Sequence, residues 1–292
     1  MNFFHSISAN QPRDYDYTLS SSYPNLVAAY SLRQLYSTYS GYAINVYNGS
    51  TYADIGFVNQ VLDLTALANH CGSNNGYIRY WYDQSSNSNT MSQSTFSAMP
   101  KIYDGASQSV VLENLKPAIQ FDGNDDILQA SSVLISGTGA RSIFAVAKTT
   151  SVSPLSTIIS LQSSPAAVNP GEHYAFTPEV AIRVSGNEVF SNDPMTTQTV
   201  GSLHLPASSN VTDHEYYSNG TLAFSVSSSG ASINTKNEGQ TEIGGWTYSE
   251  VQSFWSYFSG VIQEIIVYAS DQDGLGNRSL IESNINTYYS IY

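Results

Sequence analysis

The chain has 292 residues, of which 41% are hydrophobic and 11% charged, and 10 Lys and Arg against 23 Asp and Glu give a formal net charge of −13. A chain this acidic lacks the cationic surface that neutralises phosphates, which excludes nucleic acid and anionic membrane surfaces as partners. Globular proteins average about 25% charged residues, and the low fraction here favours a rigid, β-rich protein of an extracellular or virion type.

The sequence offers neither a membrane span nor a disulfide. No window approaches the roughly 18 consecutive apolar residues that a membrane-spanning helix needs. Cys71 is the single cysteine, so no internal disulfide can form, and we expect it to be a small, half-buried apolar side chain. The opening MNFFHSISANQPRDYDYT has no basic segment followed by an apolar one, so we expect no signal peptide. Assembly into a virus particle released by lysis is one alternative route out of a cell.

The first predicted elements in chain order are an arm, a helix and a strand. Residues 1–25 are polar and tyrosine-rich with no sustained period, which predicts an extended arm lying on the body or reaching a partner. Apolar residues at helical spacing predict a first helix over 26–40, ended by Gly41. Residues 42–49 alternate as a strand that ends in an Asn-Gly turn.

The next predicted elements are a second short helix and a second strand. We expect the helix to begin near Asp63 or Thr65 and to end before Gly72. Residues 77–84 then alternate again as a strand.

From about residue 100 the chain consists of short predicted strands joined by turns. The Asn-Gly at 219–220, between two alternating runs, is a strong hairpin signal, and the Asp-Gly at 122–123 is a similar turn. A closing helix is predicted within 277–292. Many short strands with helices only at the margins predict an all-β fold, a two-sheet jelly-roll sandwich with short peripheral helices. We expect one domain over 26–292, preceded by the arm at 1–25.

The second half of the chain resembles the concanavalin A-like, laminin-G-like family. The segments that carry this resemblance are short, but their order and spacing are specific: IQFDGNDDILQ at 119–129, EYYSNGTLAFSV at 215–226, IGGW at 243–246 and FSGVIQEIIVYASD at 258–271. The resemblance implies a concanavalin A-like jelly-roll sandwich, in agreement with the strand pattern.

The first half is similar to the catalytic domain of fungal family-54 α-L-arabinofuranosidases. The similar segments are LVAAYSLRQLYSTYSG at 26–41, LANHCGSNNGYIRYWYDQSSNSNTMSQ at 67–93 and MPKIYDG at 99–105. That family has Tyr-Asp-Gln-Ser followed by Gly-Asn-Gly-Asn. This chain has YDQS at 82–85 followed by SNSN at 86–89. Together the two resemblances cover roughly residues 26–292.

The resemblance does not extend to the catalytic carboxylates. Retaining glycosidases need two acids, one as nucleophile and one as acid/base. The family's nucleophilic Glu falls on Gly186 here, with Glu188 two residues further on, and its acid falls on Trp246. The family's disulfides are missing as well. The resemblance thus implies a glycosidase scaffold without its reaction, and we predict that the chain is not an enzyme and has no catalytic residues.

Other chemical motifs are weak. The five histidines have no paired spacing that suggests a metal site, no G-x-S-x-G elbow or phosphate loop occurs, and we expect no cofactor. The DGNDD segment at Asp122–Asp126 offers several oxygen ligands for calcium. The alternative is a tight Asp-Gly turn with solvated carboxylates, so no metal site is assigned.

The best candidates for carbohydrate binding are Trp81, Asp83, Gln84 and Trp246. Strict alternation in YIRYWYDQ would put Ile78 on the face opposite Trp81. Trp81 could then be a platform for a sugar ring, with Asp83 and Gln84 bonding sugar hydroxyls. In the alternative, Trp81 packs between the sheets while the two polar side chains bond backbone groups of the following loop.

Taken together, these features predict a non-enzymatic virion protein on a lectin-like scaffold: a phage capsid decoration, head fibre or tail-associated protein. We expect the arm to bind other virion proteins and the body to bind surface glycans, with no nucleic acid or membrane partner and with assembly as a homo-oligomer. The alternatives are a secreted, extracellular carbohydrate-binding module and an arabinofuranosidase-like hydrolase whose carboxylates are displaced.

Overall fold

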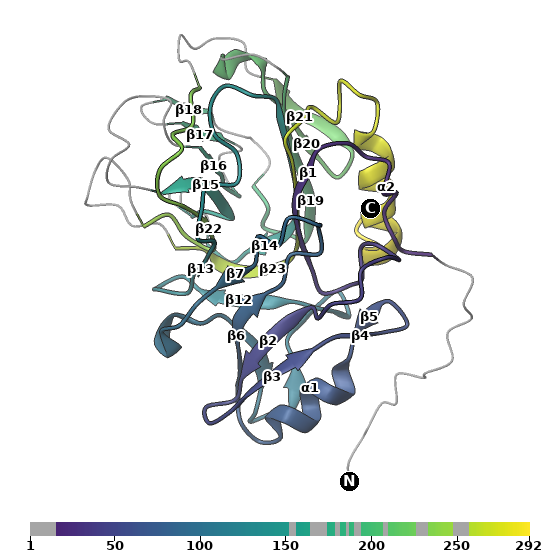
Figure 1. Cartoon of the computed structure of the whole chain (residues 1–292), viewed down its shortest axis with the longest axis vertical. Coiled ribbons are helices and arrows are strands. Elements are labelled where there is room, and N and C mark those ends of the chain that lie inside the picture. Colours follow the sequence, from purple (N-terminus) through teal and green to yellow (C-terminus); the bar gives the residue numbers. More distant parts are fainter. Residues whose placement is uncertain are drawn as a thin grey trace.

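In its described residues the protein is a two-sheet antiparallel sandwich with two α-helices at its margin (Figure 1). The predicted all-β jelly-roll class is therefore confirmed. The computed structural model describes residues 16–151, 156–163, 174–178, 182–184, 187–189, 194–206, 210–225, 233–247 and 257–292.

The strands of the first half, in chain order, are β1 (Leu26–Ser31), β2 (Ile44–Tyr47), β3 (Tyr52–Ile55), β4 (Phe57–Val58), β5 (Val61–Leu62), β6 (Gly76–Trp81), β7 (Met91–Ser92), β8 (Lys101–Asp104), β9 (Ser109–Val110), β10 (Leu112–Glu113), β11 (Lys116–Pro117), β12 (Ile119–Asp122), β13 (Leu128–Gln129) and β14 (Arg141–Thr149). Those of the second half are β15 (Ile159–Ser163), β16 (Ala175–Phe176), β17 (Ile182–Val184), β18 (Asn187–Val189), β19 (Thr199–Leu205), β20 (Glu215–Ser218), β21 (Thr221–Ser225), β22 (Gln240–Ile243) and β23 (Ser259–Tyr268). The helices are α1 (Leu64–Cys71), α2 (Arg278–Tyr289) and the short 3₁₀ turns η1 (Phe96–Ala98) and η2 (Val211–Asp213).

The first sheet is organised around β23. One edge of β23 pairs with β14, which continues through β19 and β20 to β21. The other edge pairs with β1 along one half and with β12 along the other. The pairing β12–β8 then links this sheet to β6, β2 and β3. The second sheet runs from β13 through β22, β15, β16 and β17 to β18.

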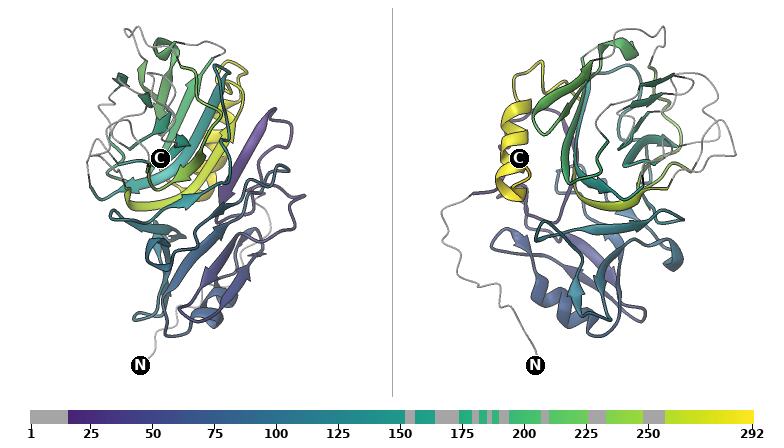
Figure 2. Two further views of the ribbon diagram at one scale, coloured as in Figure 1. Left: turned by 60° about the vertical axis from the view of Figure 1, so that its left-hand side comes forward. Right: turned by 180° about the vertical axis from the view of Figure 1, so that it is seen from behind.

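The two faces of the first sheet are both buried. Along β14, Ile143 and Ala145 point into the main core between the sheets, whereas Phe144 and Val146 point to the outer side. There they pack in a second hydrophobic cluster with α2, which lies along the outer side of the sheet (Figure 2). A strand covered on both faces is apolar throughout, which is why this segment shows no polar alternation.

The helix predicted over 26–40 is wrong. Residues 26–31 form β1, paired antiparallel with β23. Ala28 and Tyr30 face the main core while Ala29 faces the outer cluster, and all three are fully buried. A short apolar run that is buried on both faces cannot be distinguished from a helix by periodicity.

Other predicted elements are confirmed. α1 begins at the N-cap Asp63, whose carboxylate accepts a hydrogen bond from the amide of Ala66 at 2.9 Å, and it ends at Gly72. The closing helix is α2, and the hairpin β20–β21 turns at Asn219 and Gly220.

The N-terminal arm was predicted over 1–25, and residues 1–15 lie outside the described residues. Residues 16–25 run over the body, where Leu19 is buried and its amide donates to the carbonyl of Leu35 at 2.7 Å. The Tyr17 ring packs edge-on against Tyr288 of α2, with centroids 5.2 Å apart. The division between arm and domain stays a prediction.

Among the described residues, neither helix has the length and apolar character that crossing a bilayer would require.

Candidate functional site

Trp81 lies in the core. Its side chain is 0% exposed and packs near Tyr30, with ring centroids 5.9 Å apart. A fully covered indole offers no face on which a sugar could stack.

A β-bulge in β6 explains the inward direction of Trp81. Asn45 of β2 pairs with Tyr80, but the next residue, Val46, pairs with Ile78, so one residue of β6 has no partner. Such an extra residue breaks the alternation of side chains along a strand. Ile78 and Trp81, which strict alternation would separate, are therefore both buried.

Asp83 holds the loop that follows β6 against β1. Its carboxylate accepts hydrogen bonds from the amides of Ala29 (2.8 Å), Ser85 (2.8 Å) and Asn89 (2.9 Å), and from the Ser85 hydroxyl (2.6 Å). The side chain is buried, and four donors from the chain use its acceptor capacity.

Gln84 has the same kind of role. Its Oε1 accepts from the amide of Leu35 at 2.8 Å, and its Nε2 donates to the carbonyls of Ser31 (3.1 Å) and Arg33 (2.9 Å). These contacts favour the structural alternative for the YDQS segment. A role of Trp81, Asp83 or Gln84 in sugar binding stays a prediction.

Trp246 is also buried, as is Glu242, four residues earlier in the chain. Glu242 accepts hydrogen bonds from Gln129 Nε2 (2.8 Å), Gln240 Nε2 (2.9 Å), the Thr247 hydroxyl (2.6 Å) and the Thr247 amide (2.8 Å). Glu242 thereby holds the segment after β22 in place. Sugar binding by Trp246 stays a prediction. Gly186 and the side chain of Glu188 lie outside the described residues.

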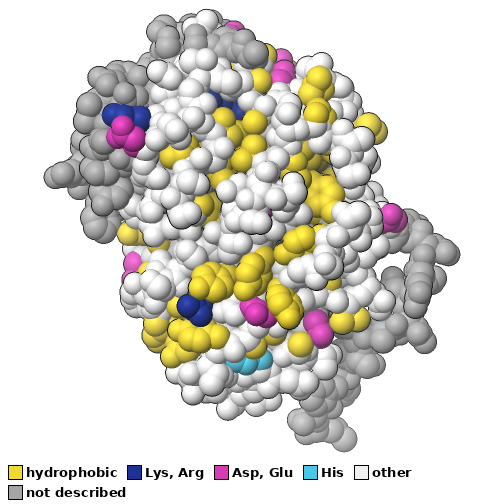
Figure 3. Space-filling view, in the orientation of Figure 1, with side chains coloured by type: hydrophobic (Ala, Val, Ile, Leu, Met, Phe, Trp, Pro, Cys, Tyr) yellow, Lys and Arg dark blue, Asp and Glu magenta, His cyan; other side chains and the backbone are white. Residues whose placement is uncertain are grey.

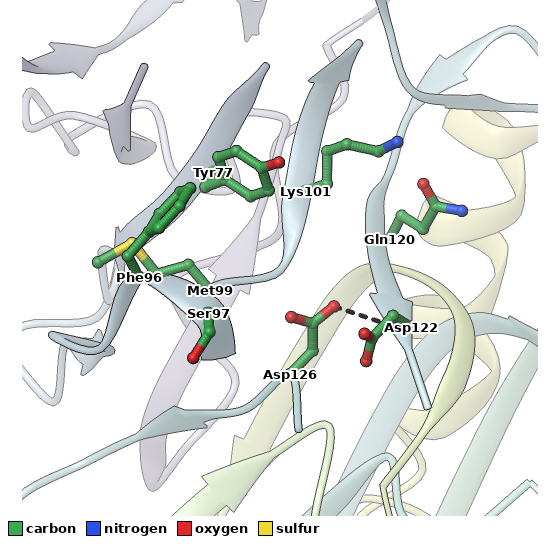
Figure 4. Close-up of a pocket in the computed structure, with 8 residues that line it drawn as sticks. All are labelled: Tyr77, Phe96, Ser97, Met99, Lys101, Gln120, Asp122 and Asp126. Carbon is green, nitrogen blue, oxygen red and sulfur yellow. Dashed lines mark hydrogen bonds between the residues drawn. The ribbon is translucent and has the colours of Figure 1, made fainter. Parts of the chain in front are cut away.

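A pocket of about 370 Å³ opens where β6, β8 and β12 meet (Figure 4). This volume lies within the range of small-molecule sites. One wall is aromatic, the opposite wall carries two carboxylates, and a lysine and a glutamine stand between them. The lining residues are Tyr77, Phe96, Ser97, Met99, Lys101, Gln120, Asp122 and Asp126.

The two carboxylates of the pocket are brought together by the turn that follows β12. Gly123 adopts φ +80°, which folds the chain back so that Asp126 Oδ2 accepts a hydrogen bond from the amide of Asp122 at 2.8 Å. Carboxylate oxygens of the two residues lie within 4.8 Å of each other. In Figure 4 both side chains face the space between the aromatic wall and Gln120.

The environments of these two acids push their pKa values apart. Burial, and then the neighbouring Asp122 carboxylate, raise the pKa of Asp126 to about 7. For Asp122, partial burial acts in the opposite direction, but hydrogen bonds from Asn124 and from the Asp125 amide hold its pKa below the usual value. Below about pH 7 the pocket therefore contains one protonated and one ionised carboxyl group, the arrangement that glycosidases use.

The calcium alternative concerns the same loop. Oxygens of Asp122, Asp125 and Asp126 lie within 4.8 Å of one another. The turn nevertheless has its own hydrogen bonds, from Asn124 to Asp122 and from Asp122 to Asp126, so its conformation needs no cation. Calcium binding stays an open alternative.

Solved structures of similar fold include an arabinofuranosidase complexed with arabinofuranosyl-α-1,2-xylobiose, with 16% identity and a TM-score of 0.64 over 89% of this chain and 62% of that chain. Two structures of a family-54 α-L-arabinofuranosidase are also similar. One is of a variant soaked with 4-nitrophenyl α-L-arabinofuranoside, and the other is of the enzyme soaked with a cyclic sulfate inhibitor. Each of these two structures has 17% identity, a TM-score of 0.64 and the same coverage. No protein-family model and no curated protein matches the chain.

The chain spans less than two thirds of each of these structures, and likeness at this identity establishes the fold. The similarity to the family-54 catalytic domain is thereby supported at the level of fold. The prediction that the chain is not an enzyme is contradicted, because the structures that share this fold are glycoside hydrolases. That prediction assumed that acids must stand at positions 186 and 246. The comparisons give no support to the virion role, which stays a prediction.

Proposed function

We propose that the protein is a carbohydrate-active enzyme that binds a neutral sugar in the Asp122–Asp126 pocket and cleaves its glycosidic bond. The observation that carries this proposal is the pair of carboxyl groups with separated pKa values, facing one another in a pocket with an aromatic wall. Separated pKa values in one site are what acid and nucleophile roles require.

In this reaction Asp126 is the acid. It gives its proton to the glycosidic oxygen while the bond between that oxygen and the anomeric carbon breaks. Asp122, ionised, forms a bond to the anomeric carbon. A water molecule then attacks that carbon, gives its proton to the Asp126 carboxylate and releases the sugar from Asp122. An oxygen separation within 4.8 Å suits this two-step retaining course, in which the carboxyl groups stand about 5–5.5 Å apart.

The first substrate to test is an α-L-arabinofuranoside, because the structures that share the fold bind such sugars. We compare 4-nitrophenyl α-L-arabinofuranoside, whose leaving group needs little protonation, with arabinofuranosyl-xylobiose, whose leaving group needs a proton. Asp126→Asn should lose roughly 10²–10⁴-fold in rate on the xylobiose derivative and much less on the aryl glycoside. Asp122→Asn should lose rate on both.

The pH profile gives a second readout. The rate on the xylobiose derivative should fall as the pH rises past about 7, because Asp126 then loses its proton, and Asp126→Asn should abolish this limb. Glu238→Gln, a change at an exposed acid that is 59% accessible, is the control and should match the wild type. Absence of turnover by the wild type on both substrates, or unchanged rates in both Asp variants, would contradict the proposal.

The location of the protein, on a virion or free outside a cell, is a separate proposal. Fractionation of purified particles would decide it.

A further inference from the structure

A continuous strip of aromatic side chains runs over the outer face of β2, β3 and β6. We call it the aromatic strip, and it consists of Tyr42, Tyr47, Tyr52, Tyr77, Tyr80, Tyr82, Phe96 and the guanidinium of Arg79. Figure 3 shows a band of hydrophobic side chains across the part of the surface where these strands lie.

Each member of the aromatic strip touches the next. At one end the Phe96 ring lies between Tyr77 and Tyr47, with centroid distances of 5.1 and 5.4 Å. Tyr47 stacks on Tyr52 at 4.7 Å, and Arg79 lies 4.4 Å from the Tyr52 ring centroid. The row is therefore one surface and not a set of isolated rings.

The other end of the row continues from Arg79 in the same way. Its guanidinium lies 4.6 Å from the Tyr80 ring centroid. Tyr80 is 5.9 Å from Tyr82, and Tyr82 is 6.3 Å from Tyr42, centroid to centroid.

The strand register sets this row. Tyr47 pairs with Tyr52 on one side and with Tyr77 on the other, which places three rings side by side across β3, β2 and β6. The bulge in β6 keeps Tyr80 at the surface while Trp81 turns inward. Tyr52 is 49% exposed and Phe96 50%, so the strip is accessible to a partner at these two rings. Contiguous apolar surface of this kind marks an interaction site.

The charges of the aromatic strip favour a neutral partner. Arg79 is held between the Tyr52 and Tyr80 rings. The neighbouring Asp54 carboxylate accepts hydrogen bonds from the Tyr82 hydroxyl and from Asn45 Nδ2, both at 2.7 Å. One cation and one anion leave the surface without net charge, and the whole chain carries −13. Single-stranded nucleic acid needs a cationic groove beside stacking rings, and an anionic polysaccharide would be repelled.

The aromatic strip leads into the pocket, since Tyr77 and Phe96 belong to both. Tyrosine supplies a rigid, amphipathic contact surface at low entropy cost. Its ring can stack on the C–H face of a sugar while its hydroxyl bonds the sugar's hydroxyls.

We propose that the aromatic strip binds a neutral polysaccharide chain and leads it toward the pocket. Binding to the strip does not depend on hydrolysis, whereas delivery to the pocket rests on the proposed function.

The test is affinity electrophoresis of the full chain in gels containing soluble neutral arabinoxylan. The wild type should be retarded, and the double variant Tyr47→Ala, Tyr52→Ala should bind at least tenfold more weakly. Tyr292→Ala is the matched control, because Tyr292 is 52% exposed and lies outside the strip, and it should be retarded like the wild type. Melting temperatures verify that each variant is folded.

Turnover separates the two proposals. Asp126→Asn should still be retarded by arabinoxylan, and the double variant should have a lower ratio of polymer to aryl-glycoside turnover than the wild type.

Equal retardation of the double variant and the wild type overturns the proposal, as does a wild type that no arabinoxylan concentration retards. A double variant that changes the sedimentation coefficient but not the retardation assigns the strip to contacts between copies instead. Loss of hydrolysis alone counts against the proposed function and leaves the strip standing.

Discussion

Two loops of this protein begin with an aspartate at the end of a strand, and the two carboxylates differ in their surroundings. After β6, the Asp83 carboxylate is buried and accepts four hydrogen bonds from its own chain. After β12, Asp122 accepts three hydrogen bonds from its own turn but is exposed beside a pocket, and Asp126, which lines the same pocket, accepts one from the Asp122 amide among the described residues. The comparison teaches that residue type does not separate a structural acid from a chemical one. The exposure of the carboxylate to a pocket is what differs between Asp83 and Asp122.

The largest effect is expected at Glu264, the extreme case of a saturated acid. Its carboxylate pairs with Arg33 through Nε at 2.8 Å and Nη2 at 2.9 Å and also accepts from the Ser31 hydroxyl, and both charges are fully buried. Glu264→Gln should reduce the free energy of unfolding by roughly 3–5 kcal/mol, because Arg33 is left buried without its partner. Urea unfolding measures this loss.

The control for Glu264 is the partly exposed pair of Lys148 and Glu113, at 3.1 Å. Glu113→Gln should cost less than about 1 kcal/mol. Equal losses in the two variants would show that burial does not set the value of these pairs.

The second prediction concerns Asp83. Asp83→Ala leaves three backbone amides without their acceptor and should cost roughly 3 kcal/mol of unfolding free energy. Asp122→Ala should cost less, because Asp122 is exposed and water can replace its carboxylate. If denaturant midpoints ranked the two variants the other way, the contrast between the loops would fail.

The third prediction is a pH dependence of stability from Asp126. The folded state keeps the Asp126 proton up to about pH 7, whereas an unfolded aspartate releases it near its usual pKa of 3.8. The folded state thus binds more protons in this window, so stability should decline as the pH rises from about 4 to 7. Asp126→Asn cannot ionise and should lose this part of the slope. Unfolding midpoints at pH 4.5, 6 and 7.5 for both proteins measure it.

The smallest effect is expected from calcium. The hydrogen bonds within the Asp122–Asp126 turn already fix its conformation, so millimolar calcium should leave the melting temperature unchanged at neutral pH. A calcium-dependent rise that disappears in Asp125→Asn would instead assign the loop to a cation, by the linkage of binding to stability.

Much of the fold was predictable from local signals. Asp63 and Gly72 bounded α1, and Asn219 with Gly220 marked a hairpin, because caps and tight turns depend on a few neighbouring residues. β1 was not predictable in this way. Its pairing with β23 joins residues more than 200 positions apart, and burial on both faces removed the alternation that marks a strand.

The candidate site was predictable in part. The DGNDD segment drew attention as a turn or a calcium loop, and the spacing of Asp122 and Asp126 around a glycine was the signal that the two acids could meet. Nothing local placed Lys101 or Phe96 against them, because the pocket forms only where β8 and η1 pack beside β12. The resemblance directed the search for acids to positions 186 and 246, where the chain has Gly186 and Trp246, and not to the Asp122–Asp126 turn.

The single extra residue in β6 adds one outward side chain to the strand without moving its neighbours from one face to the other. Excising Arg79, the residue without a partner on β2, would leave Ile78 and Trp81 two positions apart and still inward, and would remove the guanidinium from the outer face. Strand length is thus a design variable here. Libraries built from one-residue insertions and deletions could reshape the outer face in ways that exchanging one amino acid for another cannot.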